Sequence, residues 1–196
     1  MTKIITLGLE EAATGETTIE TEKVFYASID SANVLLAADD VEHQEQYQVF
    51  IPKTDLNKQA GRLRVRATTK KDDVSVYVLT FKTKASSGGD YETSQLISED
   101  VFQQVKLIAS NGMIKDRYFF NISDRSEKWE VDVFKMSDGK VANWCKIDYE
   151  FIGKIYRDIP PFPKGFSDVI PGDTTDPEEK AFISELYEKI FLTKMV

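Results

Sequence analysis

The chain has 196 residues, and apolar residues make up 41% of its composition, which is enough to form one substantial core and argues against extensive disorder. The net charge of −8 excludes broad binding to non-specific nucleic acid or to an anionic membrane, because both need a positive surface field. A single cysteine and a single histidine exclude an internal disulfide, a cysteine-based zinc cluster and a multi-histidine metal centre. Any metal ion is therefore expected to be held by oxygen ligands.

Membrane and secretion signals are missing from the sequence. No apolar run reaches the ~18 residues that a membrane span needs, and the first residues become acidic too soon for a signal peptide. We therefore expect a cytoplasmic protein that makes no membrane contact. Cys145 stands between Trp144 and Lys146 at an apolar strand position, so we expect an inert, buried thiol.

Eight segments have the alternation or the β-branched and aromatic content that is typical of strands. In chain order they are residues 19–27, 46–51, 62–69, 74–84, 91–97, 113–122, 128–136 and 141–152. Residues 31–39 are typical of a short helical connection. Asp138 and Gly139 indicate a hairpin turn between the last two strands.

Two longer helices are predicted from capping signals. Ser98 is an N-cap that is followed by two early carboxylates, and Asn111 and Gly112 close this helix. Asp176 and Pro177 begin a C-terminal helix that has an apolar stripe. We expect this second helix to pack on the apolar outside of the main domain, with docking on a partner protein as the alternative.

These elements predict one domain with a tail. Residues 1–158 form the main domain, the proline-rich residues 159–176 form a linker without regular structure, and residues 177–196 form a helix packed on the same domain. The predicted fold class is α+β and mainly β. Eight strands are the number that a small closed barrel requires, so we expect a closed eight-stranded antiparallel β-barrel with helices packed outside.

Several predicted strands carry charged residues on one face and apolar residues on the other, because successive side chains of a strand point to opposite sides. The cations are Arg62, Arg64 and Arg66 in the third strand, Lys82 and Lys84 in the fourth, and Lys115 and Arg117 in the sixth. The acids are Glu20 and Glu22 in the first strand, Glu130 and Asp132 in the seventh, and Asp148 and Glu150 in the eighth. If the sheet closes, these faces line a polar interior suited to a polyanion and a metal ion.

The charged strands resemble those of the CYTH domains, or triphosphate tunnel metalloenzymes, from about Ile19 to Phe151. The similar motifs are Glu20-x-Glu22, which is the start of the family's Glu-x-Glu-x-Lys strand, the pair Arg64-x-Arg66, the Leu-Thr-x-Lys strand ending at Lys82, Lys115-x-Arg117, the Asp132-x-Phe134 strand end, and Asp148-x-Glu150. Each motif is short. Their joint occurrence in this order and with this strand parity is what favours the family.

The resemblance implies a lumen that binds a triphosphate through arginine and lysine and Mg²⁺ or Mn²⁺ through carboxylates. It assigns catalysis to Glu20, Glu22 and Lys82. It assigns phosphate binding to Arg64, Arg66, Lys82, Lys84, Lys115 and Arg117. It assigns metal binding to Glu20, Glu22, Asp132, Asp148 and Glu150. The chemistry agrees, because arginine forks bind phosphate oxygens bidentately and carboxylates hold hard divalent cations.

Three functions remain open at the level of sequence. The first is a metal-dependent hydrolase of an inorganic, nucleoside or other organic triphosphate, and the second is an adenylate cyclase of class IV type that makes cyclic AMP and pyrophosphate. The third is a non-catalytic module that binds a nucleotide or polyphosphate. It is motivated by Val24, Asp90 and Ser94, which stand where the family's strands have a lysine, an arginine and an acid. A homodimer is compatible with the sequence.

Overall fold

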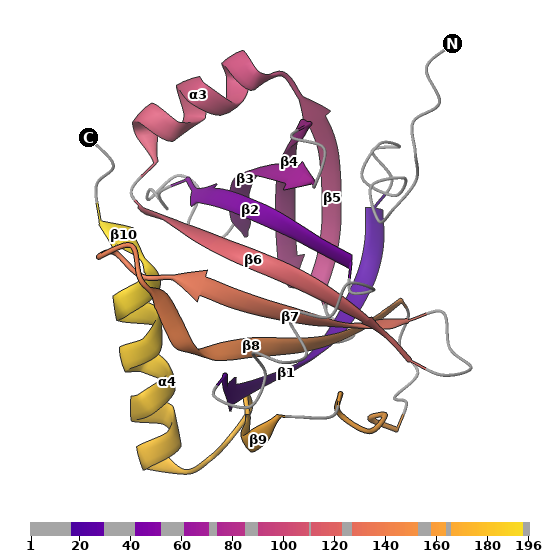
Figure 1. Ribbon diagram of the computed structural model, residues 1–196. Helices are drawn as coiled ribbons and strands as arrows, with labels where there is room; N and C mark the ends of the chain where they lie inside the picture. Colours follow the sequence, from indigo (N-terminus) through magenta and orange to yellow (C-terminus); the bar gives the residue numbers. More distant parts are fainter. Residues whose placement is uncertain are drawn as a thin grey trace.

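The computed structural model describes residues 17–29, 42–51, 61–70, 74–84, 90–109, 111–122, 127–152, 158–163 and 166–193 (Figure 1). Eight long strands carry the fold: β1 (Thr17–Ser28), β2 (Glu42–Phe50), β3 (Arg62–Lys70), β4 (Ser75–Lys84), β5 (Asp90–Ile97), β6 (Asn111–Asn121), β7 (Lys128–Lys135) and β8 (Val141–Ile152). They confirm the eight predicted strands, with ends shifted by a few residues. The helical connection predicted at residues 31–39 lies outside the described residues.

All pairings between these strands are antiparallel. The order across the sheet is β6-β2-β3-β4-β5-β1-β8-β7, and β7 also pairs with β6. The ladder between β1 and β5 is short, since it runs only from Thr17 to Glu20 of β1, while β8 pairs with β1 from Glu20 to Ser28. The mainly β, antiparallel fold class is thus confirmed, and closure into a barrel stays a prediction.

Two short strands were not predicted. β10 (Leu192–Thr193) pairs with β6, and β9 (Ser167–Pro171) pairs with the part of β1 that β5 leaves unpaired. The prediction of a linker without regular structure is therefore wrong at β9. Its proline content suggested a linker because proline cannot donate to a ladder, but an edge strand tolerates proline at its end. The N–H of Gly172 then donates to the carbonyl of Val24 at 2.7 Å and continues the contact.

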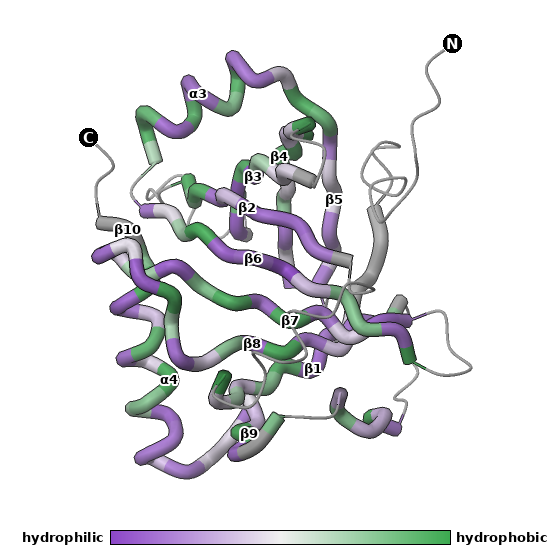
Figure 2. Tube along the Cα trace, in the orientation of Figure 1, coloured by the Kyte–Doolittle hydropathy of each residue, from purple (hydrophilic) through white to green (hydrophobic). Residues whose placement is uncertain are grey.

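Charged and apolar residues occupy opposite faces of the strands, and we call the face with the charged residues the inner face. Figure 2 shows hydrophilic and hydrophobic residues alternating along strands such as β6 and β7. On the outer face, α3 (Glu99–Ile108) covers β2 and β3 through Phe102, which packs against Val49 and Val65. A second outer cluster contains Trp129 and Tyr149 of β7 and β8 and is covered by Phe162.

The C-terminal helix α4 (Pro177–Ile190) begins where its sequence indicates and buries its apolar stripe, but it packs against a different surface from the one expected. Asp176 accepts hydrogen bonds from the N–H groups of Glu178 and Glu179, which confirms the predicted cap. The buried Leu186 and Ile190 pack in one cluster with Tyr26, Met113, Phe134, Ala142 and Trp144. These partners share the inner face with the charged residues, so the expected packing on the outside is wrong for α4.

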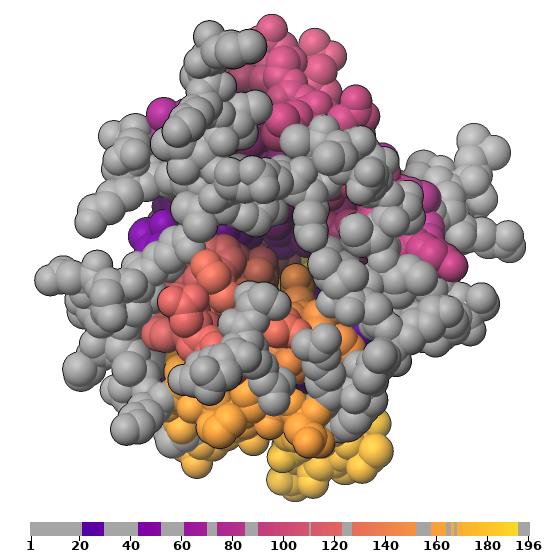
Figure 3. All heavy atoms as spheres, turned by 90° about the vertical axis from the view of Figure 1, so that its right-hand side faces the viewer, coloured from indigo at the N-terminus to yellow at the C-terminus, as the bar shows by residue number. Residues whose placement is uncertain are grey.

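The reason is that the inner face changes character along the strands. Near one end its positions become aromatic, as at Phe134 and Trp144, whose rings lie 5.3 Å apart. The apolar stripe of a helix can pack against this aromatic end of the inner face just as favourably as against the outer face. Figures 1 and 3 show α3 and α4 toward opposite ends of the molecule. Within the described residues, no helix is long and apolar enough to cross a membrane.

Packing of α4 on the inner face should contribute directly to stability. Ile190 is fully buried, whereas Phe182 on the same helix is 42% exposed. Ile190→Ala is therefore expected to lower the free energy of unfolding by about 2–4 kcal/mol, because it removes buried methylene groups and leaves a cavity. Phe182→Ala is the matched control and should lower it by less than about 1 kcal/mol. Urea unfolding followed by tryptophan fluorescence measures both, and equal effects would contradict this packing.

Candidate functional site

One wall of the inner face is formed by β3, β4 and β5. Arg62 of β3 lies opposite Lys82 of β4, and Lys82 lies opposite Glu92 of β5. This register brings cations beside acids, and the contacts are Arg62 with Asp90 at 3.1 Å, Lys84 with Asp90 at 2.9 Å, Lys82 with Glu92 at 2.9 Å and Arg64 with Glu92 at 3.6 Å. Arg62 and three of the predicted phosphate-binding cations, Arg64, Lys82 and Lys84, are therefore paired with carboxylates of β5.

Arg66 differs from its neighbours on β3. Its Nε is buried without a hydrogen-bond partner, and within the described residues no carboxylate lies in ion-pair distance of its guanidinium. Burial, together with the positive charges of Arg64 and Arg117, lowers the pKa of Arg66 to about 10. Arg66 remains a cation at neutral pH, so an incoming anion would relieve its repulsion from the other arginines.

The opposite wall is centred on Asp132 of β7, which is completely buried. Arg117 Nε donates to Oδ1 of Asp132 at 2.7 Å, Arg117 NH2 donates to Oδ2 at 2.9 Å, and Lys115 also donates to Oδ2. Burial alone would raise the pKa of Asp132, but Arg117 and Lys115 outweigh it and hold the pKa well below its usual range. Both oxygens of Asp132 are thus occupied by cations.

Arg117 connects Asp132 to the other acids of this wall. Its NH1 contacts Glu130, and its NH2 lies 3.9 Å from Asp148. Burial would lower the pKa of Arg117, but the charges of Asp132 and Glu130 raise it further above its usual value. One guanidinium therefore lies beside three carboxylates from two neighbouring strands and offsets part of their negative charge.

Lys146 of β8 belongs to the same site, although it was not among the predicted residues. Its Nζ donates to Oδ2 of Asp148 at 2.6 Å. Burial would lower the pKa of Lys146, but the negative charges of Asp148 and Glu22 outweigh burial and raise it. Strand parity offers a signal that could have found Lys146, because it is two and four residues before Asp148 and Glu150 and shares their face.

The remaining acids crowd one another. The charge of Glu130, followed by burial, raises the pKa of Glu150 to about 7, and burial raises that of Asp148 to about 6. Oδ1 of Asp148 is buried without a hydrogen-bond partner. Crowded carboxylates with an unpaired buried oxygen fit a hard divalent cation, which would remove the repulsion and supply the missing partner.

The full predicted metal set is not assembled in the described part of the structure. Glu22 is exposed, and the side chain of Glu20 lies outside the described residues. Among the side chains that are described, no three acids, histidines or cysteines are gathered into a ready metal site. The metal ligands therefore stay a prediction, which the chemistry of Asp148 and Glu150 favours and the engaged oxygens of Asp132 do not.

A cavity of about 510 Å³ brings most of the predicted residues together. It is lined by eight of them: Glu22, Arg64, Lys82, Lys115, Arg117, Asp132, Asp148 and Glu150. Lys84 instead lines a second cavity of about 730 Å³, and Arg66 lines neither of these two. Sequence reasoning missed Lys146 and Tyr187, which line both cavities, and treated Arg62, which also lines both, only as one of the charged strand residues.

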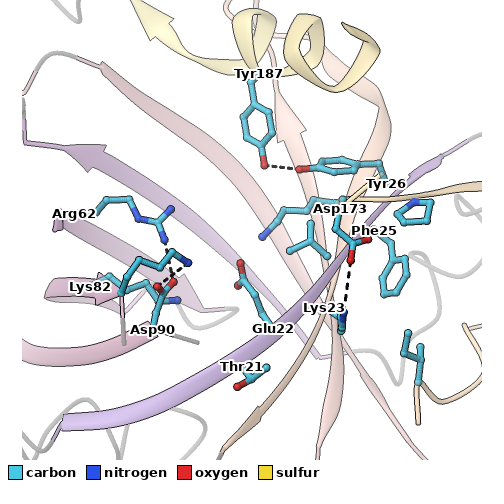
Figure 4. A pocket seen from close by; sticks show the side chains of 16 residues that line it. Thr21, Glu22, Lys23, Phe25, Tyr26, Arg62, Lys82, Asp90, Asp173 and Tyr187 are labelled. Carbon is cyan, nitrogen blue, oxygen red and sulfur yellow. Dashed lines mark hydrogen bonds and ion pairs between the residues drawn. The ribbon is translucent and has the colours of Figure 1, made fainter. Parts of the chain in front are cut away.

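The two cavities meet at Glu22, Arg62, Lys82, Lys146 and Tyr187. Figure 4 shows Glu22 pointing into the space between Arg62 and Lys82 on one side and the paired tyrosines on the other. The hydroxyls of Tyr26 and Tyr187 lie 2.9 Å apart, so that α4 is joined to β1 at the border of the site. The arrangement offers cations on two walls and carboxylates beside them.

The raised pKa of Glu150 has a consequence for stability. Because its pKa is about 7 in the folded chain and 4.5 ordinarily, ionisation favours the unfolded state, and the contribution present below pH 4.5 is lost as the pH rises through 7. Glu150→Gln should therefore stabilise the metal-free protein by about 1–3 kcal/mol at pH 8 and change little at pH 4. Urea unfolding in the presence of a chelator measures this difference.

The exposed Glu188 of α4 supplies the control for this experiment. Glu188→Gln should leave the stability at both pH values within about 0.5 kcal/mol of the parent. A Glu150→Gln variant that is no more stable than the parent at pH 8 would show that Glu130 and Glu150 do not repel each other as the structure indicates.

Comparison with known proteins gives a family match. The model of the CYTH domain matches residues 16–159. Among solved structures, the chain is similar to the inorganic triphosphatase NE1496, with 17% identity over 79% of this chain and 87% of that one and a TM-score of 0.46. It is also similar to the PH1819 protein of Pyrococcus horikoshii, with 14% identity over 90% and 94% of the two chains and a TM-score of 0.47.

A third similar structure is a Bacillus halodurans protein that is provisionally assigned as an adenylate cyclase. The two sequences are 16% identical over 70% of this chain and 83% of that one, with a TM-score of 0.48. The comparison with curated proteins found no match.

Proposed function

We propose that this chain, which belongs to the CYTH domain family, is a divalent-metal-dependent hydrolase of a triphosphate bound on the inner face of its sheet. The observation that supports the proposal is the composition of one cavity. Cations of β3, β4, β6 and β8 line it together with carboxylates of β1, β7 and β8. A triphosphate is a chain of charged oxygens that such cations bind, and hydrolysis needs little more than positioning and neutralisation.

The cations of β3 and β4 are the proposed phosphate-binding residues. Arg64 and Lys82 each lie beside Glu92 in the structure, at 3.6 and 2.9 Å. A triphosphate would compete with this carboxylate for the same donors. Arginine offers a planar fork that binds two phosphate oxygens in a fixed geometry. Lysine offers a mobile point charge that neutralises phosphate without fixing its orientation.

The acids divide into two groups in this proposal. Glu22, Asp148 and Glu150, with Glu20, would hold Mg²⁺ or Mn²⁺, which neutralises charge on the phosphate chain and activates a water molecule when bound. Asp132 has a different role, because its oxygens already bind Arg117 and Lys115. It holds these two cations in a fixed orientation, so that they are preorganised to bind the substrate.

We further propose that the eight long strands enclose this cavity as a barrel. The pairing of β7 with both β6 and β8 supports the enclosure, and α4 covers the aromatic end of the inner face. Enclosure excludes water and so strengthens every electrostatic contact with the substrate.

Purified protein with Mg²⁺ or Mn²⁺ is expected to release phosphate from inorganic triphosphate or a nucleoside triphosphate. Glu22→Gln should lower turnover by at least about tenfold, and added Mn²⁺ should restore part of it, because the variant acts through the metal. Glu185→Gln, on the exposed side of α4, is the matched control and should retain full turnover. Release by the parent that does not exceed that of Glu22→Gln would contradict the proposal.

The products of ATP separate hydrolysis from cyclisation. ADP with phosphate is expected, whereas cyclic AMP with pyrophosphate would assign the site to the cyclase, because the same triphosphate contacts serve either reaction. Chromatography of the reaction mixture measures this. Binding of triphosphate without any turnover would instead favour the non-catalytic module.

Substitution of Lys82 tests the phosphate contact itself. Lys82→Ala should weaken triphosphate binding about ten- to a hundredfold, because it removes a charge-assisted hydrogen bond. Lys140→Ala, in the exposed turn between β7 and β8, is the control and should bind as tightly as the parent. Isothermal titration calorimetry measures the affinities. Equal affinity of the Lys82→Ala protein and the parent would remove Lys82 from the site.

A further inference from the structure

Lys146 is a cation of the inner face that neither the sequence motifs nor the family match assigns to the site. Its side chain is only 17% exposed, and it lines both cavities. In β8 it lies opposite Tyr26 of β1 and, on its other side, opposite Asp132 of β7. Lys146 is therefore held between the α4 end of the inner face and the acid cluster.

Its position complements the cations of the other wall. Arg62 and Lys82 are the other two basic residues that line both cavities, and both belong to the wall formed by β3, β4 and β5. Lys146 belongs to the wall formed by β1, β7 and β8. An anion at the junction of the two cavities would thus meet basic groups from two walls instead of one.

The contact between Lys146 and Asp148 leaves the ammonium able to bind a second group. Asp148 takes one of its donors, and a lysine ammonium has three donors on a flexible stem. Lys115, in contrast, is 5% exposed and donates to the fully occupied Asp132. Lys146 can keep its carboxylate partner and still reach a ligand in the cavity.

The neighbouring strand provides an independent way to test this position. Val24 of β1 is the register partner of Asp148, and it lines the larger cavity. Cβ atoms of such directly opposite residues lie about 4.5–5.5 Å apart. A lysine at residue 24 could therefore reach the same carboxylate from the other strand and bring its ammonium to the region that Lys146 occupies.

We propose that Lys146 is a phosphate-binding residue of this site, which binds the triphosphate from the wall opposite Arg62 and Lys82. The inference rests on the proposed function, since it takes a triphosphate as the ligand. It also explains how the inner face can do without a cation at residue 24: the positive charge beside Asp148 comes from β8 instead of β1.

The test is calorimetric binding of inorganic triphosphate to folded variants, with steady-state kinetics as a second measurement. Lys146→Gln should weaken binding about ten- to a hundredfold. Lys146→Arg should stay within about threefold of the parent. The double variant Val24→Lys/Lys146→Val should bind at least about tenfold more tightly than the single variant Lys146→Val. Lys189→Gln, on the exposed side of α4, is the matched control and should bind like the parent.

The outcomes separate this inference from the proposed function. A folded Lys146→Gln protein that binds as tightly as the parent overturns the inference, and the hydrolase proposal stands if the parent turns over. Weakened binding that neither arginine nor the relocated lysine restores assigns Lys146 to structural support and also overturns it. A parent that binds triphosphate without turnover overturns the hydrolase proposal. The binding affinities of the Lys146 variants then decide by themselves whether Lys146 binds phosphate. A parent that binds no triphosphate overturns both.

Discussion

The structure depends on pairing the charges that its strands bury on one face. Burial of an unpaired carboxylate or ammonium is far more costly than burial of an apolar group, so the inner face is stable only if its two signs meet. Asp132 shows the requirement most directly, because it is fully buried and receives three hydrogen bonds from Lys115 and Arg117. The register of β6, β7 and β8 is what brings these groups together.

Pairing is uneven across the inner face, and this unevenness is what a binding site requires. Around Asp132 the contacts are complete and buried, so they fix the orientation of Arg117. Elsewhere they are incomplete, as at the unpaired Nε of Arg66 and the unpaired Oδ1 of Asp148. In the proposed function, the rigid part would position the charges, and an anion and a metal cation would stabilise the part whose polar atoms lack partners.

The aromatic end of the inner face gives α4 its place. Met113, Phe134 and Trp144 continue the strands that carry the charged residues, so the same face is polar in its middle and apolar at one end. The helix buries this apolar end and, through the hydroxyl contact between Tyr187 and Tyr26, reaches the border of the cavities. Core packing and the candidate site therefore share one face of the sheet and one helix.

The sequence alone determined the eight strands, the two helix caps and the division of charged and apolar residues between two faces. These are local properties, since strand parity acts over two residues and a cap over three. They also identified the family through Glu22, Lys82, Lys115 and Asp148, which lie around one cavity. None of these inferences needed to know which strands are neighbours.

Only the tertiary structure decided which charges meet. The order of the strands is set by contacts between residues far apart in the chain, and no local pattern states that Lys146 lies between Tyr26 and Asp132 or that Asp132 is occupied by two cations. The same holds for β9, whose partner is the free edge of β1, and for α4, whose apolar stripe fits an inner or an outer surface equally well. A hydrophobic stripe specifies that one side of a helix is buried, whereas long-range pairing of the strands specifies which surface buries it.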